Sequence, residues 1–165
     1  MENQLDFYRS FHTHPINQSI HTVCIPAIVL CVLNYSSLLR IHLEFLNRNE
    51  NKNEKYYSRW YTISLEDLIS IFYITQYYRI YGFKIGSVMF GYIQVLLFLS
   101  HIWRNTFENK WISQTHKVFV IAWILQFLGH AIEGNRPSLM TSLTQTAFQA
   151  PLFTLEHSMP FVFEN

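Results

Sequence analysis

The hydrophobic residues of this chain lie in long stretches that are almost free of charge. Eighteen consecutive residues between His21 and Arg40 carry no formal charge, and residues 137–155 form a second uncharged stretch of nineteen. Crossing a bilayer as a helix takes about 20 apolar residues. A soluble amphipathic helix would instead show a polar face at every third or fourth position, which neither stretch does. The pattern therefore predicts membrane-spanning helices.

Three more hydrophobic segments lie between these two. Residues 68–78 are short enough to be either a span or an interfacial helix, residues 85–103 are interrupted by His101, and residues 118–132 contain one histidine. The expected fold is all-α, a polytopic membrane bundle of four to five hydrophobic segments. A water-soluble helical bundle is the alternative, and the short second and fourth segments are its best support.

The length of 165 residues favours one domain over the whole chain, 1–165. Residues 41–63 are rich in asparagine and charge, so we expect a solvated polar loop there. Half of all residues are hydrophobic and only 14% are charged, against roughly 25% in an average soluble protein. With a net charge of +1, the chain has no basic surface for nucleic acid.

A first group of polar residues precedes the first hydrophobic stretch, in the sequence FHTHPINQSIH. His12 and His14 come just before Pro15, a residue suited to the first turn of a helix. On that helix Asn17 and His21 lie four residues apart and share a face. Either earlier histidine can fold back over this face from the preceding turn.

A second group follows the fourth hydrophobic segment, in QFLGHAIEGNRPSL. Gln126, His130 and Glu133 are spaced four and three residues apart, which puts an amide, an imidazole and a carboxylate on one side of a helix. Arg136 follows at the helix end, and Pro137 begins the next segment. A single histidine in an apolar helix is more often a hydrogen-bonded packing residue than a ligand. Ionisable groups at membrane depth are costly to bury, however, and usually mark function.

The order of the segments brings the two groups together. If every segment crosses, then His12, His21, His130 and Glu133 all finish at one membrane face. The same parity puts a second set at the opposite face: His42, His101, His116, Glu156 and His157.

Three imidazoles, or two imidazoles and a carboxylate, would leave open positions on a divalent metal, as catalytic zinc and non-haem iron sites require. The sequence contains no HExxH motif and none of the histidine boxes typical of membrane desaturases. It also lacks a glycine-rich phosphate loop and a GxSxG elbow. A metal site is chemically sensible, but spacing alone does not identify it.

Taken jointly, the two groups resemble a known family. The pattern F-H-x-x-P-x-N-x-x-I-H, the later Q-F-x-G-H…E…R-P-x-L and a downstream A-P-x-F are similar to small endoplasmic-reticulum membrane proteins. The characterised member is an iron(II)-dependent dioxygenase that shortens 2-hydroxy fatty acids by one carbon during phytosphingosine degradation. The resemblance runs from Phe7 to about Glu156.

The resemblance implies iron(II), Fe(2+), as cofactor, with His12, His21 and His130 as its ligands. It further implies that Asn17, Glu133 and Arg136 support catalysis. The implied substrates are a long-chain 2-hydroxy fatty acid and dioxygen, with the acyl tail among the first, fourth and fifth segments. The implied location is the endoplasmic reticulum membrane, in a multi-pass protein in contact with membrane lipid.

Some assignments stay open at this point. The spacing before the carboxylates Glu133 and Glu156 is one residue shorter than in the family, and His14 stands where the family often has asparagine. These three residues therefore remain alternatives as a further group at the metal. Two other functions also remain. One is a non-catalytic membrane protein that binds or organises lipids and uses its histidines for packing. The other is a zinc-dependent lipid hydrolase.

Overall fold

The protein is described by a computed structural model that covers residues 8–42, 62–135, 137 and 143–163. Its elements, in chain order, are α2 (Pro15–Ser36), β1 (Arg40–His42), β2 (Thr62–Ser64), α3 (Leu65–Phe107), η3 (Glu108–Lys110), α4 (Trp111–Glu133), α5 (Leu143–Ser158) and η5 (Pro160–Val162). Helices dominate the described residues, which confirms the all-α prediction.

The helix α2 begins seven residues before the uncharged stretch that predicted it. Pro15 occupies the first helical position, and the ring of His14 accepts a hydrogen bond from the backbone N–H of Ile16 at 3.2 Å. This cap satisfies one of the N–H groups that a helix leaves free at its start. As a result Asn17 and His21 lie within the helix rather than before it.

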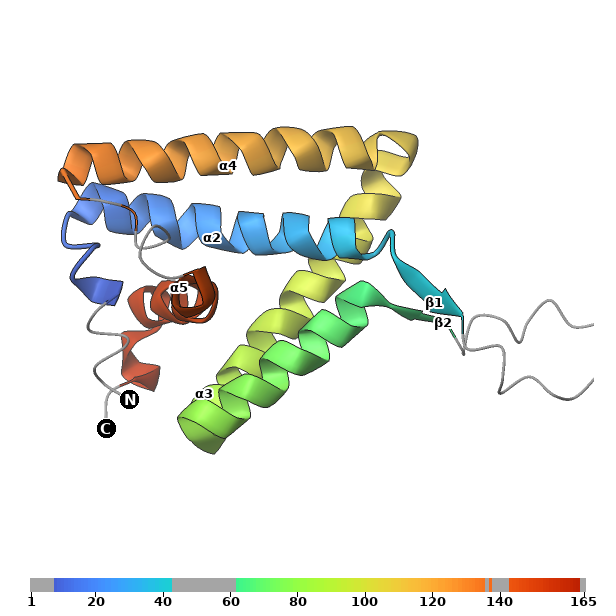
Figure 1. Cartoon of the computed structure of the whole chain (residues 1–165), viewed down its shortest axis with the longest axis horizontal. Coiled ribbons are helices and arrows are strands. Elements are labelled where there is room, and N and C mark those ends of the chain that lie inside the picture. Colours follow the sequence, from blue (N-terminus) through green and yellow to red (C-terminus); the bar gives the residue numbers. More distant parts are fainter. Residues whose placement is uncertain (1–7, 43–61, 136, 138–142, 164–165) are drawn as a thin grey trace, which may run out of the picture.

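The helix α3 is a hairpin of two arms that turns at Gly82, where the backbone has a φ of 77° and is not helical. Glycine adopts this left-handed conformation without steric cost. The arms correspond to the predicted segments 68–78 and 85–103. Tyr77 of the first arm and Met89 of the second are both fully buried in the core between them. Figure 1 shows the two arms side by side, pointing away from α2.

The helices α2 and α4 lie lengthwise beside each other and run in opposite directions (Figure 1). Gly129 permits this close approach, because a Cβ atom at this position would overlap the side-chain oxygen of Asn17. The predicted fourth segment, 118–132, is extended by two further turns and begins at Trp111. This pair of helices joins the first and second polar groups of the sequence.

The helix α5 runs across the start of α2 and is seen nearly end-on in Figure 1. It has 16 residues and begins at Leu143, so it is shorter than the predicted stretch 137–155. Residues 138–142 of that stretch lie outside the described part. Leu152 and Phe153 turn inward and are buried.

The polar loop prediction needs one correction at its ends. Residues 40–42 pair as a strand with residues 62–64, antiparallel, with Ile41 opposite Ile63. The charged pattern of residues 41–63 concealed these short strands, whose middle positions are both isoleucine. Residues 43–61 lie outside the described part.

Within the described residues, two stretches are long and apolar enough to cross a membrane: α2 and the continuous helical run from Leu65 to Glu133. That run includes the Gly82 turn and the short η3 turn between α3 and α4. The number of separate crossing segments stays a prediction.

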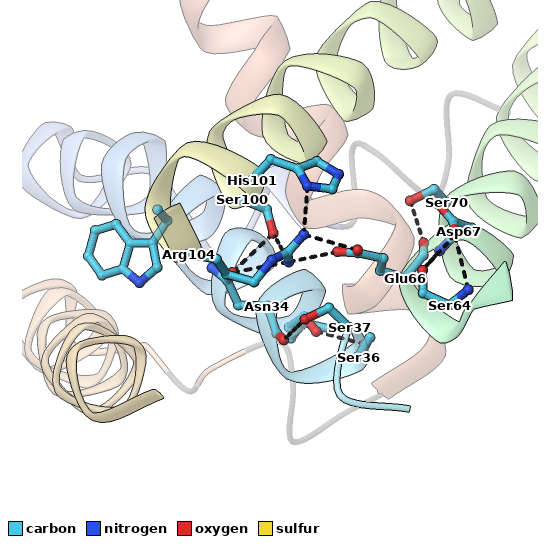
Figure 2. A network of polar contacts seen from close by, with 12 residues as sticks. Asn34, Ser36, Ser37, Ser64, Glu66, Asp67, Ser70, Ser100, His101 and Arg104 are labelled. Carbon is cyan, nitrogen blue, oxygen red and sulfur yellow. Dashed lines mark hydrogen bonds and ion pairs between the residues drawn. The ribbon is translucent and has the colours of Figure 1, made fainter. Parts of the chain in front are cut away.

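A buried polar network joins the end of α2 to both arms of α3 (Figure 2). The guanidinium of Arg104 binds both carboxylate oxygens of Glu66, at 2.9 and 3.1 Å. It also donates to the hydroxyl of Ser100 at 2.7 Å and to the side-chain oxygen of Asn34 at 3.3 Å. The network fixes the far end of α2, thirteen residues from His21.

Candidate metal centre

Three buried histidines from distant parts of the chain meet at the start of α2. His12 precedes the helix, His21 lies in its second turn, and His130 comes from the last turn of α4. One ring nitrogen from each lies within 4.8 Å of the other two. The ring centroids are 4.2 to 5.0 Å apart. The three rings therefore surround a single point, as ligands of one ion would.

Backbone carbonyls hold two of these rings in orientation. The Nδ1 atom of His12 lies 2.8 Å from the carbonyl oxygen of Tyr8, and that of His21 lies 3.0 Å from the carbonyl oxygen of Asn17. A carbonyl only accepts, so each Nδ1 carries the proton and leaves the lone pair on Nε2. Metal-binding histidines usually show this arrangement.

Ring nitrogens of the cluster that lack a hydrogen-bond partner indicate whether a metal ion fits among the three rings. Among the described residues, His12 Nε2 and His130 Nδ1 are buried and have no hydrogen-bond partner. A buried polar atom without a partner is unfavourable, and most such atoms in proteins are satisfied. A divalent cation among the three rings would satisfy both nitrogens and leave coordination positions free. The donor set fits a metal ion.

The protonation state of His12 also suits a ligand. Burial lowers the pKa of the His12 imidazole from 6.5 to about 4. The ring is therefore neutral near pH 7 and has a lone pair to offer.

Glu133 lies beside the three rings but is engaged by the start of α2. Its carboxylate accepts hydrogen bonds from the hydroxyl of Thr13 at 2.7 Å and from the backbone N–H of His14 at 3.1 Å. It also accepts from the backbone N–H of Thr13 and from the side-chain amide of Asn17. A carboxylate at this position complements the free N–H groups of a helix N-terminus. The geometry makes Glu133 an anchor between α4 and α2.

The other predicted residues are placed as follows. Asn17 is fully buried and joins Glu133 to His21, whereas His14 caps α2 and is not part of the three-histidine cluster. Arg136 lies outside the described residues. The structure thus brings together five of the six residues that the resemblance implies for the site.

The parity argument was wrong for Glu156 and His157. Glu156 forms an ion pair with Arg9, near His12, and the ring of His157 stacks on Phe153 at 6.5 Å. Both residues therefore lie at the end of the bundle that holds the three rings. The reason is that α5 runs across α2 instead of returning along it.

The parity argument was right for two histidines of the second set. His116 contacts the hydroxyl of Tyr35 at 3.2 Å, and His101 contacts Arg104 at 3.1 Å. Both partners lie at the other end of the bundle. The side chain of His42 lies outside the described part.

An apolar cavity of about 280 Å³ opens beside the ring cluster, between α2, α3, α4 and α5. His21 and His130 are among its lining residues, as are Ser70 of the first arm of α3 and Leu33, which lies twelve residues or about 18 Å beyond His21 on α2. Sequence reasoning expected hydrophobic walls from the first, fourth and fifth segments. It missed the contribution of α3, because the hairpin turn at Gly82 that directs its first arm to this cavity is set by tertiary packing.

Tyr8 was also missed by sequence reasoning. It is buried, its ring stacks on His12 at a centroid distance of 4.3 Å, and its carbonyl orients the same ring. A signal was present: Tyr8 precedes His12 by four residues, just as Asn17 precedes His21. In a helical turn, a spacing of four residues brings the backbone carbonyl of the first residue close to the ring of the histidine that follows it.

Comparison with known proteins gives a consistent result. A family model described as "2-hydroxy-palmitic acid dioxygenase Mpo1-like" matches residues 1–160. The 2-hydroxy-palmitic acid dioxygenase MPO1 of Saccharomyces cerevisiae is 30% identical over 156 residues, which cover 94% of this chain and 77% of the yeast protein. No solved structure matches the chain.

Proposed function

The chain belongs to the 2-hydroxy-palmitic acid dioxygenase Mpo1-like family, and from this premise we propose that it is a membrane dioxygenase that removes one carbon from 2-hydroxy fatty acids. The proposed cofactor is iron(II), held by His12, His21 and His130. One observation carries the proposal: three buried imidazoles, two of them with an unpartnered ring nitrogen, meet beside an apolar cavity. The cavity suits an acyl tail, and the rings suit the metal that acts on its head group.

The residues of the chain have separate roles in this proposal. The three histidines hold the metal, and Asn17 and Glu133 keep the histidine-bearing helices in register. The chemistry supplied by bound iron(II) is charge stabilisation of the substrate head group and electron transfer with dioxygen. In the proposed reaction the bond between C1 and C2 breaks, and one 2-hydroxy acid and one dioxygen give an acid one carbon shorter, one carbon dioxide and one water.

The cavity contributes substrate binding and excludes water. Its walls are almost entirely aliphatic and aromatic, with Tyr73, Trp123 and Phe127 among them. Burying hydrocarbon contributes about 0.8 kcal/mol for each methylene. A long tail therefore binds more tightly than a short one and holds the head group at the rings.

The outer surface supports a membrane location. Of the most apolar 18 residues of α2, only 33% are buried, and of the most apolar 18 residues in the Leu65–Glu133 run, only 28% are buried. The core helix of a soluble protein would be mostly buried. On α4 the exposed large hydrophobic residues are Ile112, Val120, Ile121, Ile124, Leu125, Phe127, Leu128 and Ile132. Such extended apolar surface is rare on soluble monomers. These features favour a membrane bundle over a soluble one, and the resemblance points to a multi-pass protein of the endoplasmic reticulum.

The test uses purified, detergent-solubilised protein loaded with iron(II) under air, with 2-hydroxypalmitate as substrate. We expect a fatty acid one carbon shorter, loss of product after chelation, and its return on adding iron(II). His130→Ala should lose both bound iron and product, whereas His116→Ala, at the other end of the bundle, should retain both.

The alternatives give different results in the same experiment. A lipid-binding protein without activity would hold no stoichiometric metal, and histidine substitutions would change its stability only. A zinc hydrolase would contain zinc and would work equally well without oxygen. Either outcome would reject the proposed dioxygenase.

A further inference from the structure

Gln126 lies on the cavity-facing side of α4, one turn before His130. Four residues along a helix correspond to a rise of about 6 Å. The residue is only 6% exposed and lines the same cavity as His21 and His130. It is therefore a buried amide at the cavity end where the proposed substrate head group would lie.

The side-chain oxygen of Gln126 has no hydrogen-bond partner among the described residues. A carbonyl oxygen of this kind only accepts hydrogen bonds, so what it lacks is a donor. The cavity walls are largely apolar, and none of their described donors bonds this oxygen. A buried acceptor that faces a cavity in this way is satisfied when a ligand brings the donor.

The head group of a 2-hydroxy acid carries one such donor. Its carboxylate is ionised near neutral pH and can only accept, whereas its hydroxyl can donate. A fatty acid without the hydroxyl would leave the Gln126 oxygen buried and unpaired. We infer that Gln126 accepts a hydrogen bond from the 2-hydroxyl group and makes the cavity selective for 2-hydroxylated over plain fatty acids.

This inference rests on the proposed function, because it assumes that a fatty acid head group occupies the cavity end. It adds a residue that distinguishes two substrates of the same length and charge. A site built around a hydroxyl rejects the analogue that lacks it strongly, because its own polar group is then left unpaired.

The test measures binding rather than turnover. A fluorescent fatty acid bound to the metal-loaded protein is displaced without oxygen, by 2-hydroxypalmitate or by palmitate, and the ratio of the two dissociation constants is compared between variants. Gln126→Met removes the acceptor and keeps the length of the side chain. We expect it to reduce the preference for the hydroxy acid by about tenfold or more, the scale of one lost hydrogen bond, while palmitate, which no longer leaves an oxygen unpaired, binds at least as well as before.

Two further variants make the result specific. Gln126→Glu keeps acceptor oxygens but adds a negative charge, so affinity for both acids should fall while their ratio is kept. Gln114→Met makes the same change as the first variant at a position three turns earlier on α4 that does not line the cavity, and it should leave both affinities unchanged. If Gln126→Met fails to fold, the Gln126→Glu ratio decides the question.

The inference is overturned if Gln126→Met weakens both acids equally or leaves the preference as it was, or if Gln126→Glu loses the preference. In these cases turnover of 2-hydroxypalmitate by the unchanged protein would still support the proposed function. If the unchanged protein neither turns over 2-hydroxypalmitate nor prefers it to palmitate, the inference and the proposed function both fail.

Discussion

The carboxylate of Glu133, the last residue of α4, accepts a hydrogen bond from the side-chain amide of Asn17 in the first turn of α2. The backbone carbonyl of Asn17 in turn lies 3.0 Å from Nδ1 of His21. One chain of contacts therefore runs from the helix that carries His130 to the ring of His21. The position of the candidate metal ligands depends on how these two helices are joined.

Glu133→Gln should weaken metal binding without removing a ligand. The substitution takes away the charge that holds Thr13, His14 and Asn17, so the start of α2 is held less firmly. Changes to groups that orient ligands typically lower metal affinity 10- to 100-fold, and we expect a loss of about tenfold. Iron(II) titration checks this. Glu108→Gln, at the exposed η3 turn, is the control. Unchanged affinity in Glu133→Gln would show that the anchor is not needed.

Gly129→Ala should push α2 and α4 apart. The added Cβ would overlap the side-chain oxygen of Asn17, which is buried and cannot move freely. Overpacking of this kind costs about 1–3 kcal/mol of stability, and we expect bound iron to fall as well. The control is Gly91→Ala in α3, where a Cβ meets nothing within 4 Å; it should raise stability by about 0.5–1 kcal/mol. Thermal unfolding in detergent measures both, and equal melting temperatures would contradict the steric argument.

The sequence carried enough information to predict the helices and the meeting of the histidines. Uncharged stretches located the helices, and the parity of successive segments brought His21 and His130 to one end, where the structure also has them. The prediction worked because it needs only the direction of each segment. The prediction failed for Glu156 because α5 lies across the bundle, and the direction of α5 is determined by its packing against α2 and α3.

Other features depend on contacts that no sequence pattern reveals. The role of Glu133 as an anchor follows from the distance between two helices, and that distance is permitted by Gly129. The pairing of Glu66 with Arg104 joins residues 38 positions apart on two arms of one hairpin. Neither residue stands out in the sequence, because charges at the ends of hydrophobic segments usually face water.

Glu66→Gln should destabilise the protein strongly. It leaves the guanidinium of Arg104 buried without its carboxylate partner, since the two side chains are only 13% and 6% exposed. Breaking a buried ion pair from one side costs about 3–5 kcal/mol, whereas replacing both partners by apolar residues is often neutral. The double variant Glu66→Leu with Arg104→Leu should therefore be more stable than Glu66→Gln. Chemical unfolding compares them, and a double variant weaker than the single one would refute this account.

Ser70→Leu should shorten the acyl tails that the protein accepts. Ser70 is buried and lines the cavity. Its hydroxyl donates to the carbonyl of Glu66, and Arg104 joins Glu66 to Asn34, which lies thirteen residues or about 20 Å along α2 from His21. Ser70 therefore lies toward the end of the cavity away from that histidine. A leucine side chain would fill this end. Because each buried methylene contributes about 0.8 kcal/mol, excluding two of them lowers affinity about tenfold.

The measurement for Ser70→Leu is turnover of two 2-hydroxy acids, myristic and stearic, in competition. We expect the longer acid to lose about tenfold relative to the shorter one, with the shorter acid little changed, because the head group and the rings are untouched. Ser113→Leu makes the same change at an exposed position on α4 and should leave the ratio as it is. If Ser70→Leu leaves the ratio of the two acids unchanged, the tail does not reach Ser70, and the acyl chain would then have to leave the cavity sideways between α3 and α4 into the surrounding lipid.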